Sequence, residues 1–283
     1  MQRQYGKWLL LAPAGLWFGI MLVLPLCFIL VFSVGDRAAA GGYVPAFTFA
    51  QYANLATRWP VFRNTLTLAP LGTVLALVIA YPLAYFLAVQ ASAKWRTLLL
   101  ILVIVPFWTS ILIRSYAWIF ILGGQGLPAL LGWLGITLPR LVNTPFAVLV
   151  GIIYGYLPLM VLPIFVSLDR LDKRLLEASA DLGAPPFRSF LQVTLPLSLP
   201  GIATGCMLVF ILLMGEYLIP SMLGGGMVFF IGNALVDLFL QSRNWAFGAA
   251  VSVTLVAVML VTVSAYMWLM RRLGGARDDV SLM

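Results

Sequence analysis

Charged residues are scarce in this sequence, and histidine is missing altogether. Of its 283 residues, 9% are charged and 63% are hydrophobic, whereas a soluble domain has about 25% charged and about 45–50% apolar residues. So few charges cannot cover a water-exposed surface, which excludes a soluble globular protein, and the high apolar content excludes intrinsic disorder. Without histidine the chain also lacks the commonest general base and metal ligand.

Cysteine is rare, and a phosphate-binding motif is absent. The two cysteines, Cys27 and Cys206, lie deep in apolar runs, where they cannot form a zinc site alone and indicate no disulfide framework. No G-x-x-x-x-G-K-[ST] pattern occurs, so the chain has no visible nucleotide-binding loop of its own. The formal net charge of +8 is interpreted as membrane topology and contact with anionic lipid, with no need for nucleic acid.

Long apolar runs are abundant. A helix that crosses a bilayer needs about 20 apolar residues, and six segments qualify without the alternation typical of membrane β-barrels. The sequence therefore predicts an all-α integral membrane protein with six transmembrane helices in a single domain, residues 1–283. The expected spans are residues 8–34, 64–89, 97–122, 144–167, 199–220 and 246–270.

The distribution of lysine and arginine predicts the orientation. With the N-terminus inside, eleven of these residues lie in inside segments and five in outside loops, which places both termini in the cytoplasm. Arg3 and Lys7 before an apolar run, followed by Ala38–Ala40, also resemble a cleaved secretory signal. That run is longer than the roughly 7–15 residues of a signal core, so a retained helix is favoured. The inside residues are Arg3, Lys7, Lys94, Arg96, Arg170, Lys173, Arg174, Arg188, Arg271, Arg272 and Arg277, and the outside residues are Arg37, Arg58, Arg63, Arg140 and Arg243.

The inside loop at residues 168–198 differs from the others because it holds four basic and four acidic residues among apolar ones. A helix is expected from Asp172, its N-cap, to Leu182, with Gly183 as the left-handed residue that ends it. A second short helix is expected over residues 186–193. A connection alone needs only a few residues, so this helix–turn–helix is interpreted as a docking surface for a partner.

The same loop resembles the cytoplasmic sequence pattern of permease subunits of binding-protein-dependent ABC importers. That pattern is Glu-Ala-Ala, three residues, Gly, nine residues, an aliphatic residue, any residue, then Leu-Pro. Here every spacing matches, although Ser179 replaces the second alanine. The resemblance implies a type I ABC importer permease fold in which residues 177–196 form the coupling helix that docks into an ATPase. The expected coupling residues are Glu177, Ala178, Ser179, Asp181, Leu182, Gly183, Phe187, Val193, Leu195 and Pro196.

Further short segments resemble the spermidine/putrescine permease B subfamily, from about residue 64 to about residue 270 as the family core. In that family the subunit pairs with a second, related permease in the inner membrane. The pair sits on two ATPase subunits, which bind ATP and Mg²⁺, and it receives substrate from a periplasmic binding protein. The resemblance therefore implies polyamine import, with no cofactor bound by this chain and no catalysis by it. The matching segments are residues 105–109, 113–114, 169–173, 181–184, 215–217, 222–225, 231–233 and 245–250.

Arg114 and Glu216 are the only charges inside the six expected spans. A charge in the membrane is costly unless it is paired or hydrated, so each is a candidate functional residue. The two residues are expected at similar depth, where they could pair with each other. Glu216 with Tyr217 is the candidate lining of a pathway for an amine cation, through ion pairing and cation–π contact.

Three other residues are weaker candidates for this pathway, because a simpler explanation is preferred for each. Asp237 is read first as a solvated loop residue, and Trp108 and Tyr116 are read first as part of the aromatic belt at the membrane surface.

Three alternative functions remain open at this point. An ABC permease for another small organic solute fits the same loop. A self-sufficient channel or secondary carrier needs intramembrane ion sites, for which two charges are weak support. It also leaves the helix–turn–helix at residues 168–198 unexplained. An intramembrane enzyme is hard to assemble without histidine or clustered carboxylates in the spans.

Overall fold

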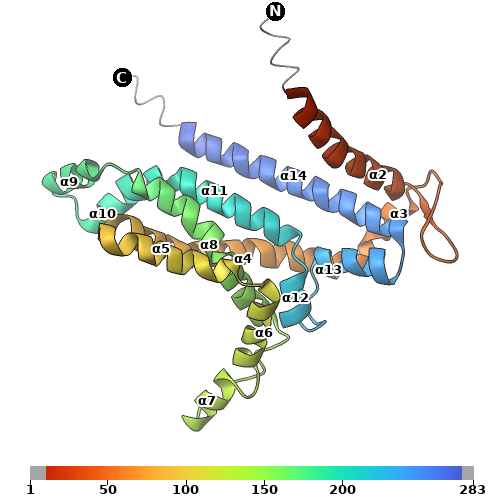
Figure 1. The fold of residues 1–283 in the computed structure, drawn as a ribbon, viewed down its shortest axis with the longest axis horizontal. Helices are drawn as coiled ribbons and strands as arrows, with labels where there is room; N and C mark the ends of the chain where they lie inside the picture. The colour runs from red at the N-terminus through yellow and green to blue at the C-terminus, as the bar shows by residue number, and fades with distance from the viewer. Residues whose placement is uncertain (1–10, 276–283) are drawn as a thin grey trace, which may run out of the picture. The chain divides into compact units, whose positions relative to one another are not determined.

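A computed structural model describes residues 11–275 of the chain, and these are mostly helical (Figure 1). Arg3, Lys7 and Arg277, which contribute to the predicted orientation, lie outside the described residues. Within residues 11–275, five helices are long and apolar enough to cross a membrane, and the number rises to six if one sharply bent pair counts as a single span. The contacts divide the chain into two compact units, Met1–Pro60 with Ala234–Val261 and Val61–Asn233 with Thr262–Met283.

The first unit contains an apolar helix at Leu11–Ser33 and a short β-hairpin. In the hairpin, Asp36 pairs with Val44 in antiparallel register, and these two short strands form the only sheet among the described residues. The Arg37 guanidinium donates a hydrogen bond to the carbonyl oxygen of Ser242 at 3.0 Å. The elements of this unit include η1 (Gly19–Val23), α2 (Leu24–Ser33), β1 (Asp36–Arg37), β2 (Tyr43–Val44), α3 (Ala50–Ala53), η2 (Asn54–Arg58) and η5 (Asp237–Gln241).

The second unit is built around long helices that pack through small residues. Figure 1 shows α5, α8 and α11 running alongside one another. A Cβ atom added at Gly201 of α11 would lie 2.5 Å from the carbonyl oxygen of Pro163 in α8, and one at Gly205 would lie 2.9 Å from the sulfur of Met160. Only glycine permits this close approach, as is usual where membrane helices pack. The long helices are α4 (Trp59–Tyr85) with the π-helical turn η3 (Phe86–Gln90), α5 (Ala93–Trp108), α8 (Pro145–Asp169) and α11 (Leu195–Met214).

Two helices belong in part to each unit. Helix α14 (Trp245–Gly275) and the short α13 (Ile231–Val236) each pass from one unit into the other.

The second span begins earlier than expected. One helical run extends over Ala50–Gln90 and includes much of the expected first outside loop.

The expected third span, residues 97–122, is broken. Helix α5 ends at Trp108, and α6 (Ile111–Leu122) follows after a 93° bend. Thr109 and Ser110 between them have extended backbones, and the turn follows Pro106, which weakens the end of α5 by removing a backbone donor. A short helix α7 (Leu127–Trp133) follows.

The expected fifth span is shifted toward the inside loop at residues 168–198. Helix runs without interruption over Pro186–Met214, so Pro196 does not separate the loop from the span. The π-helical turn η4 (Phe190–Thr194) immediately precedes this proline, and its wider backbone helps to accommodate a ring that would clash in a regular α-helix. The helix ends at Met214, before Glu216, and α12 (Leu218–Leu223) follows.

Candidate functional site

Helix α9 (Lys173–Asp181) begins where the sequence predicts. Its N-cap, Asp172, has an extended backbone, and the side-chain Oδ1 accepts the backbone N–H of Arg174 at 3.0 Å. This bond satisfies one of the donors that every helix start leaves unpaired, and the carboxylate lies at the positive end of the helix dipole. The helix predicted in the loop at residues 168–198, here called the docking loop, is therefore confirmed as a structural element.

The end of α9 requires glycine. Gly183 has a φ of +75° with open space around it. Its N–H donates to the carbonyl oxygen of Ala180 at 2.8 Å, and the next N–H, of Ala184, donates to that of Ser179 at 3.1 Å. These two bonds form the turn that typically closes a helix through a left-handed residue. Helix α10 (Pro186–Ser189) then starts with a proline, whose φ suits a first helical position.

The two short helices are joined by a pair of serines. The hydroxyl oxygens of Ser179 on α9 and Ser189 on α10 lie 2.7 Å apart, within hydrogen-bond distance. Ser179 is the one position where the sequence departs from the Glu-Ala-Ala pattern. Its hydroxyl makes a contact that alanine could not make. The contact links α9 to α10 through their side chains.

The expected coupling residues divide into two groups by exposure. The first group projects outward, and it includes two large apolar side chains, Leu182 at 88% exposure and Phe187 at 71%. Such side chains surrounded by charges are what a docked partner would cover. The exposed members are Glu177, Ala178, Asp181, Leu182, Gly183 and Phe187, and the half-buried members are Ser179, Val193, Leu195 and Pro196.

Aromatic contacts tie the later part of the docking loop to α4. The ring of Phe190 meets the rings of Tyr81 and Tyr85 edge-to-face, at centroid distances of 5.7 and 6.3 Å. The hydroxyl of Tyr81 also lies 3.0 Å from that of Ser198 in α11. Sequence reasoning missed both tyrosines. The cue was that two polar-tipped rings occur one turn apart in the apolar second half of α4.

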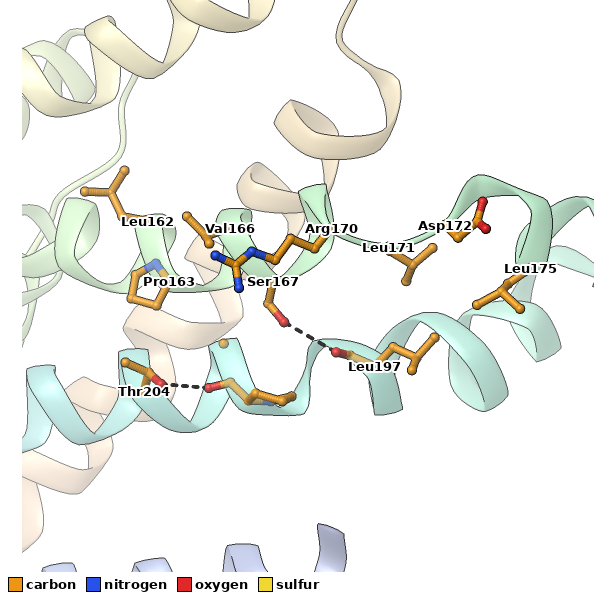
Figure 2. Close-up of a pocket in the computed structure, with 12 residues that line it drawn as sticks. Leu162, Pro163, Val166, Ser167, Arg170, Leu171, Asp172, Leu175, Leu197 and Thr204 are labelled. Atoms are coloured by element: carbon orange, nitrogen blue, oxygen red, sulfur yellow. Dashed lines mark hydrogen bonds between the residues drawn. The ribbon is translucent and has the colours of Figure 1, made fainter. Parts of the chain in front are cut away.

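A groove of about 760 Å³ lies at the start of the docking loop, between α8 and α11 (Figure 2). Apolar side chains such as Leu162 and Val166 form much of its lining. Arg170 lies along the groove wall in Figure 2, close to Ser167, whose hydroxyl donates to the carbonyl oxygen of Leu197 at 3.3 Å. Among the described residues Arg170 has no ion-pair partner, so its charge remains available at this end of the bundle.

Glu216 caps a helix in this structure. Its side chain is 7% exposed, and Oε1 accepts the backbone N–H groups of Leu218 and Ile219 at 2.7 and 3.2 Å. The hydroxyl of Tyr156 donates to Oε2. These three bonds place the carboxylate at the positive end of α12 and largely satisfy its need for donors.

Arg114 lies just past the bend, in the first turns of α6. Its Nε and Nη1 atoms are buried and have no hydrogen-bond partner among residues 11–275, and its guanidinium carbon lies 6.0 Å from the ring centroid of Tyr154. Within the described part of the chain no ion pair joins Arg114 to Glu216. The pairing that the sequence left open is therefore not made in this structure, because the carboxylate is engaged in capping α12.

The remaining pathway candidates differ in their surroundings. Asp237, in the first unit, forms an ion pair with Arg58 at 3.3 Å, and both side chains are about one third exposed. Trp108 and Tyr116 are 81% and 62% exposed, and Tyr217 is 45% exposed. Glu216 and Tyr217, which are adjacent in sequence, lie at the break before α12. Trp108 lies in α5 and Tyr116 in α6.

Comparisons with known proteins agree along the length of the chain. The chain is 39% identical to the spermidine/putrescine transport system permease protein PotB of Haemophilus influenzae, over 88% of this chain and 89% of the relative. It is 40% identical to the protein of the same name from Escherichia coli K12, over 91% and 94%. An inner membrane ABC transporter permease protein, YdcU of Escherichia coli K12, is 31% identical over 95% and 90%.

A solved structure shares the fold. A bacterial ABC transporter involved in the import of the acidic polysaccharide alginate superposes with a TM-score of 0.75, at 19% identity, over 96% of both chains. Residues 72–275 match the protein family described as the binding-protein-dependent transport system inner membrane component. This match covers more than half of the sequence and includes the whole docking loop. The chain belongs to the family of inner membrane components of binding-protein-dependent transport systems.

Proposed function

We propose that this chain is the permease subunit of an ATP-driven ABC importer that moves polyamines such as spermidine and putrescine from the periplasm to the cytoplasm. The observation that carries the proposal is the identity of about 40% to spermidine/putrescine permeases over nearly the whole chain. The folded docking loop supports it, since a channel or a self-sufficient carrier has no need for such a surface.

The proposed complex contains a second, related permease, two ATPase subunits and a periplasmic binding protein. ATP and Mg²⁺ bind to the ATPase subunits, and this chain performs no covalent chemistry. An alginate importer with this fold has been solved in complex with its periplasmic protein bound to an alginate pentasaccharide, which supports a comparable delivery of substrate here.

The docking loop is proposed to receive the force of ATP binding. Leu182 and Phe187 would insert into the ATPase, while Glu177 and Asp181 pair with basic residues around the contact. Closure of the ATPases would then move residues 177–196 and shift the helix bundle between inward-open and outward-open states. This role requires the loop and both termini to face the cytoplasm, as the distribution of lysine and arginine predicts.

The proposed pathway for an amine cation includes Glu216 and Tyr217 at the break before α12. The carboxylate offers ion pairing, and the exposed face of Tyr217 offers cation–π contact. Because Glu216 is enclosed by its hydrogen bonds in this structure, contact with substrate requires α12 to move. Trp108, Arg114, Tyr116 and Asp237 complete the proposed set of pathway residues.

The test is a substrate panel on the reconstituted complex with its binding protein. Spermidine and putrescine are expected to stimulate ATP hydrolysis and to enter proteoliposomes. Stimulation by another organic solute, with none by polyamines, would retain the importer and reject the polyamine substrate. Uptake by this chain alone, without ATPase subunits, would reject the importer.

A further inference from the structure

Arg96, near the start of α5, contacts two other helical segments of the second unit. Its Nη1 lies 2.7 Å from Oδ1 of Asp169, the last residue of α8. Its Nε donates to the carbonyl oxygen of Leu87 at 3.3 Å, and Nη2 donates to that of Ala88 at 2.7 Å. The ring of Phe165 lies under the guanidinium, with its centroid 5.7 Å from the guanidinium carbon.

The two carbonyl groups belong to the π-helical turn η3, which ends the second long helix of the chain. The last carbonyl groups of a helix lack partners within it and carry partial negative charge, so a guanidinium there is favourable. One planar side chain thus joins the end of η3, the start of α5 and the end of α8. Only arginine has donors arranged to make all three contacts together, because the ammonium of lysine is a single point.

The position of Asp169 gives this arrangement its significance. Asp169 directly precedes the segment of the docking loop that carries α9. On the far side of the loop, Phe190 and Ser198 contact Tyr81 of α4. Both ends of the loop are therefore attached to the last turns of α4 and η3, and Arg96 makes the attachment at the first end.

We propose that Arg96 is a positioning residue for ATP-driven transport, which transmits displacement of the docking loop to η3 and α5 through Asp169. The inference rests on the proposed function of the loop. Without the guanidinium, the end of α8 can move while η3 and α5 stay in place. ATP hydrolysis then continues with less substrate moved for each ATP consumed.

The test measures spermidine uptake and ATP hydrolysis in the same proteoliposomes, normalised to assembled complex. With Arg96→Gln, the ratio of uptake to hydrolysis is expected to fall about tenfold, the scale set by losing charge-assisted hydrogen bonds. Arg96→Lys should give an intermediate ratio. Lys94→Gln removes an exposed cation on the same helix that has no ion pair within the described chain, and it should leave the ratio unchanged.

The exchanged pair Arg96→Asp with Asp169→Arg tests whether Arg96 acts through all of its contacts or only through its ion pair with Asp169. Opposite charges still face each other, but a carboxylate now meets the carbonyl groups of Leu87 and Ala88, so the ratio is expected to stay low. Recovery of the ratio in the exchanged pair would overturn the proposal. An unchanged ratio in Arg96→Gln would also overturn it. If Arg96→Gln assembles poorly, Asp169→Asn tests the same link and should lower the ratio. No spermidine uptake by the unaltered complex would instead contradict the proposed polyamine function.

Discussion

The hydroxyl oxygens of Ser179 and Ser189 lie 2.7 Å apart, so a hydrogen bond joins the two short helices of the docking loop. The family pattern has alanine where this chain has Ser179. The chain therefore keeps a small residue at this position and adds a polar contact that alanine lacks.

Replacing either serine should loosen the loop by a small amount. Ser179→Ala and Ser189→Ala each remove the bond, which is worth about 0.5–1.5 kcal/mol, so faster amide hydrogen exchange is expected over α9 and α10. The double variant should exchange no faster than the single variants, because one interaction is lost in every case. Additive effects would show that the two hydroxyls act independently.

Gly183→Val should disrupt transport by straining the end of α9. A branched side chain at a φ of +75° costs about 1–2 kcal/mol or more, which is expected to open the turn and displace Leu182. Gly135→Val is the matched control, because Gly135 has a φ of +78° and equally open surroundings but lies outside the docking loop. Equal losses of spermidine uptake in the two variants would remove any special role for Gly183.

Glu216→Gln tests whether this carboxylate serves only as a helix cap. Loss of its charge at the start of α12 should lower the free energy of unfolding by about 1–3 kcal/mol, measured by thermal denaturation in detergent. Tyr156→Phe removes one bond to the same carboxylate and keeps the charge. If Glu216 also meets the substrate amine, Glu216→Gln loses more spermidine uptake than Tyr156→Phe at matched stability. Equal uptake in both would leave Glu216 a structural residue.

Arg114→Met should raise stability, because two buried donors of Arg114 have no partner in the described part of the chain and an unsatisfied buried donor costs about 1–3 kcal/mol. Arg140→Met, at an exposed position, controls for the loss of one positive charge and should change stability little. A gain in thermal stability together with reduced uptake identifies Arg114 as a functional residue. A loss of stability would mean that its guanidinium supports the fold.

The sequence predicted the docking loop well because its signals are local. Asp172 as a cap and Gly183 as a helix end act within a few residues of themselves, and both occupy the predicted positions. The long apolar runs likewise predicted the helical class, since hydrophobicity alone determines which segments can enter a bilayer.

The breaks between helices could not be predicted in the same way. Pro106 and Gly215 lie next to the breaks at residues 109–110 and 215–217. The chain also has prolines and glycines inside uninterrupted helices, such as Pro70 and Gly201, so these residues alone could not show where a helix ends. The fifth span starts earlier than the expected residue 199, because the helix continues through Pro196 after the π-helical turn. The contacts of Arg96 and Tyr81 were missed for the same reason, since nothing near either residue indicates its partner.

The most direct test of the account is Glu177→Arg in the complete complex, with uptake, ATP hydrolysis and substrate capture measured together. Glu177 is exposed on α9, so the change should leave the fold intact while reversing a charge at the proposed ATPase contact. Gln125→Arg, at an exposed position between α6 and α7, is the control. We expect Glu177→Arg to abolish spermidine uptake while the binding protein still captures spermidine. Normal uptake in this variant would contradict the docking role of the loop.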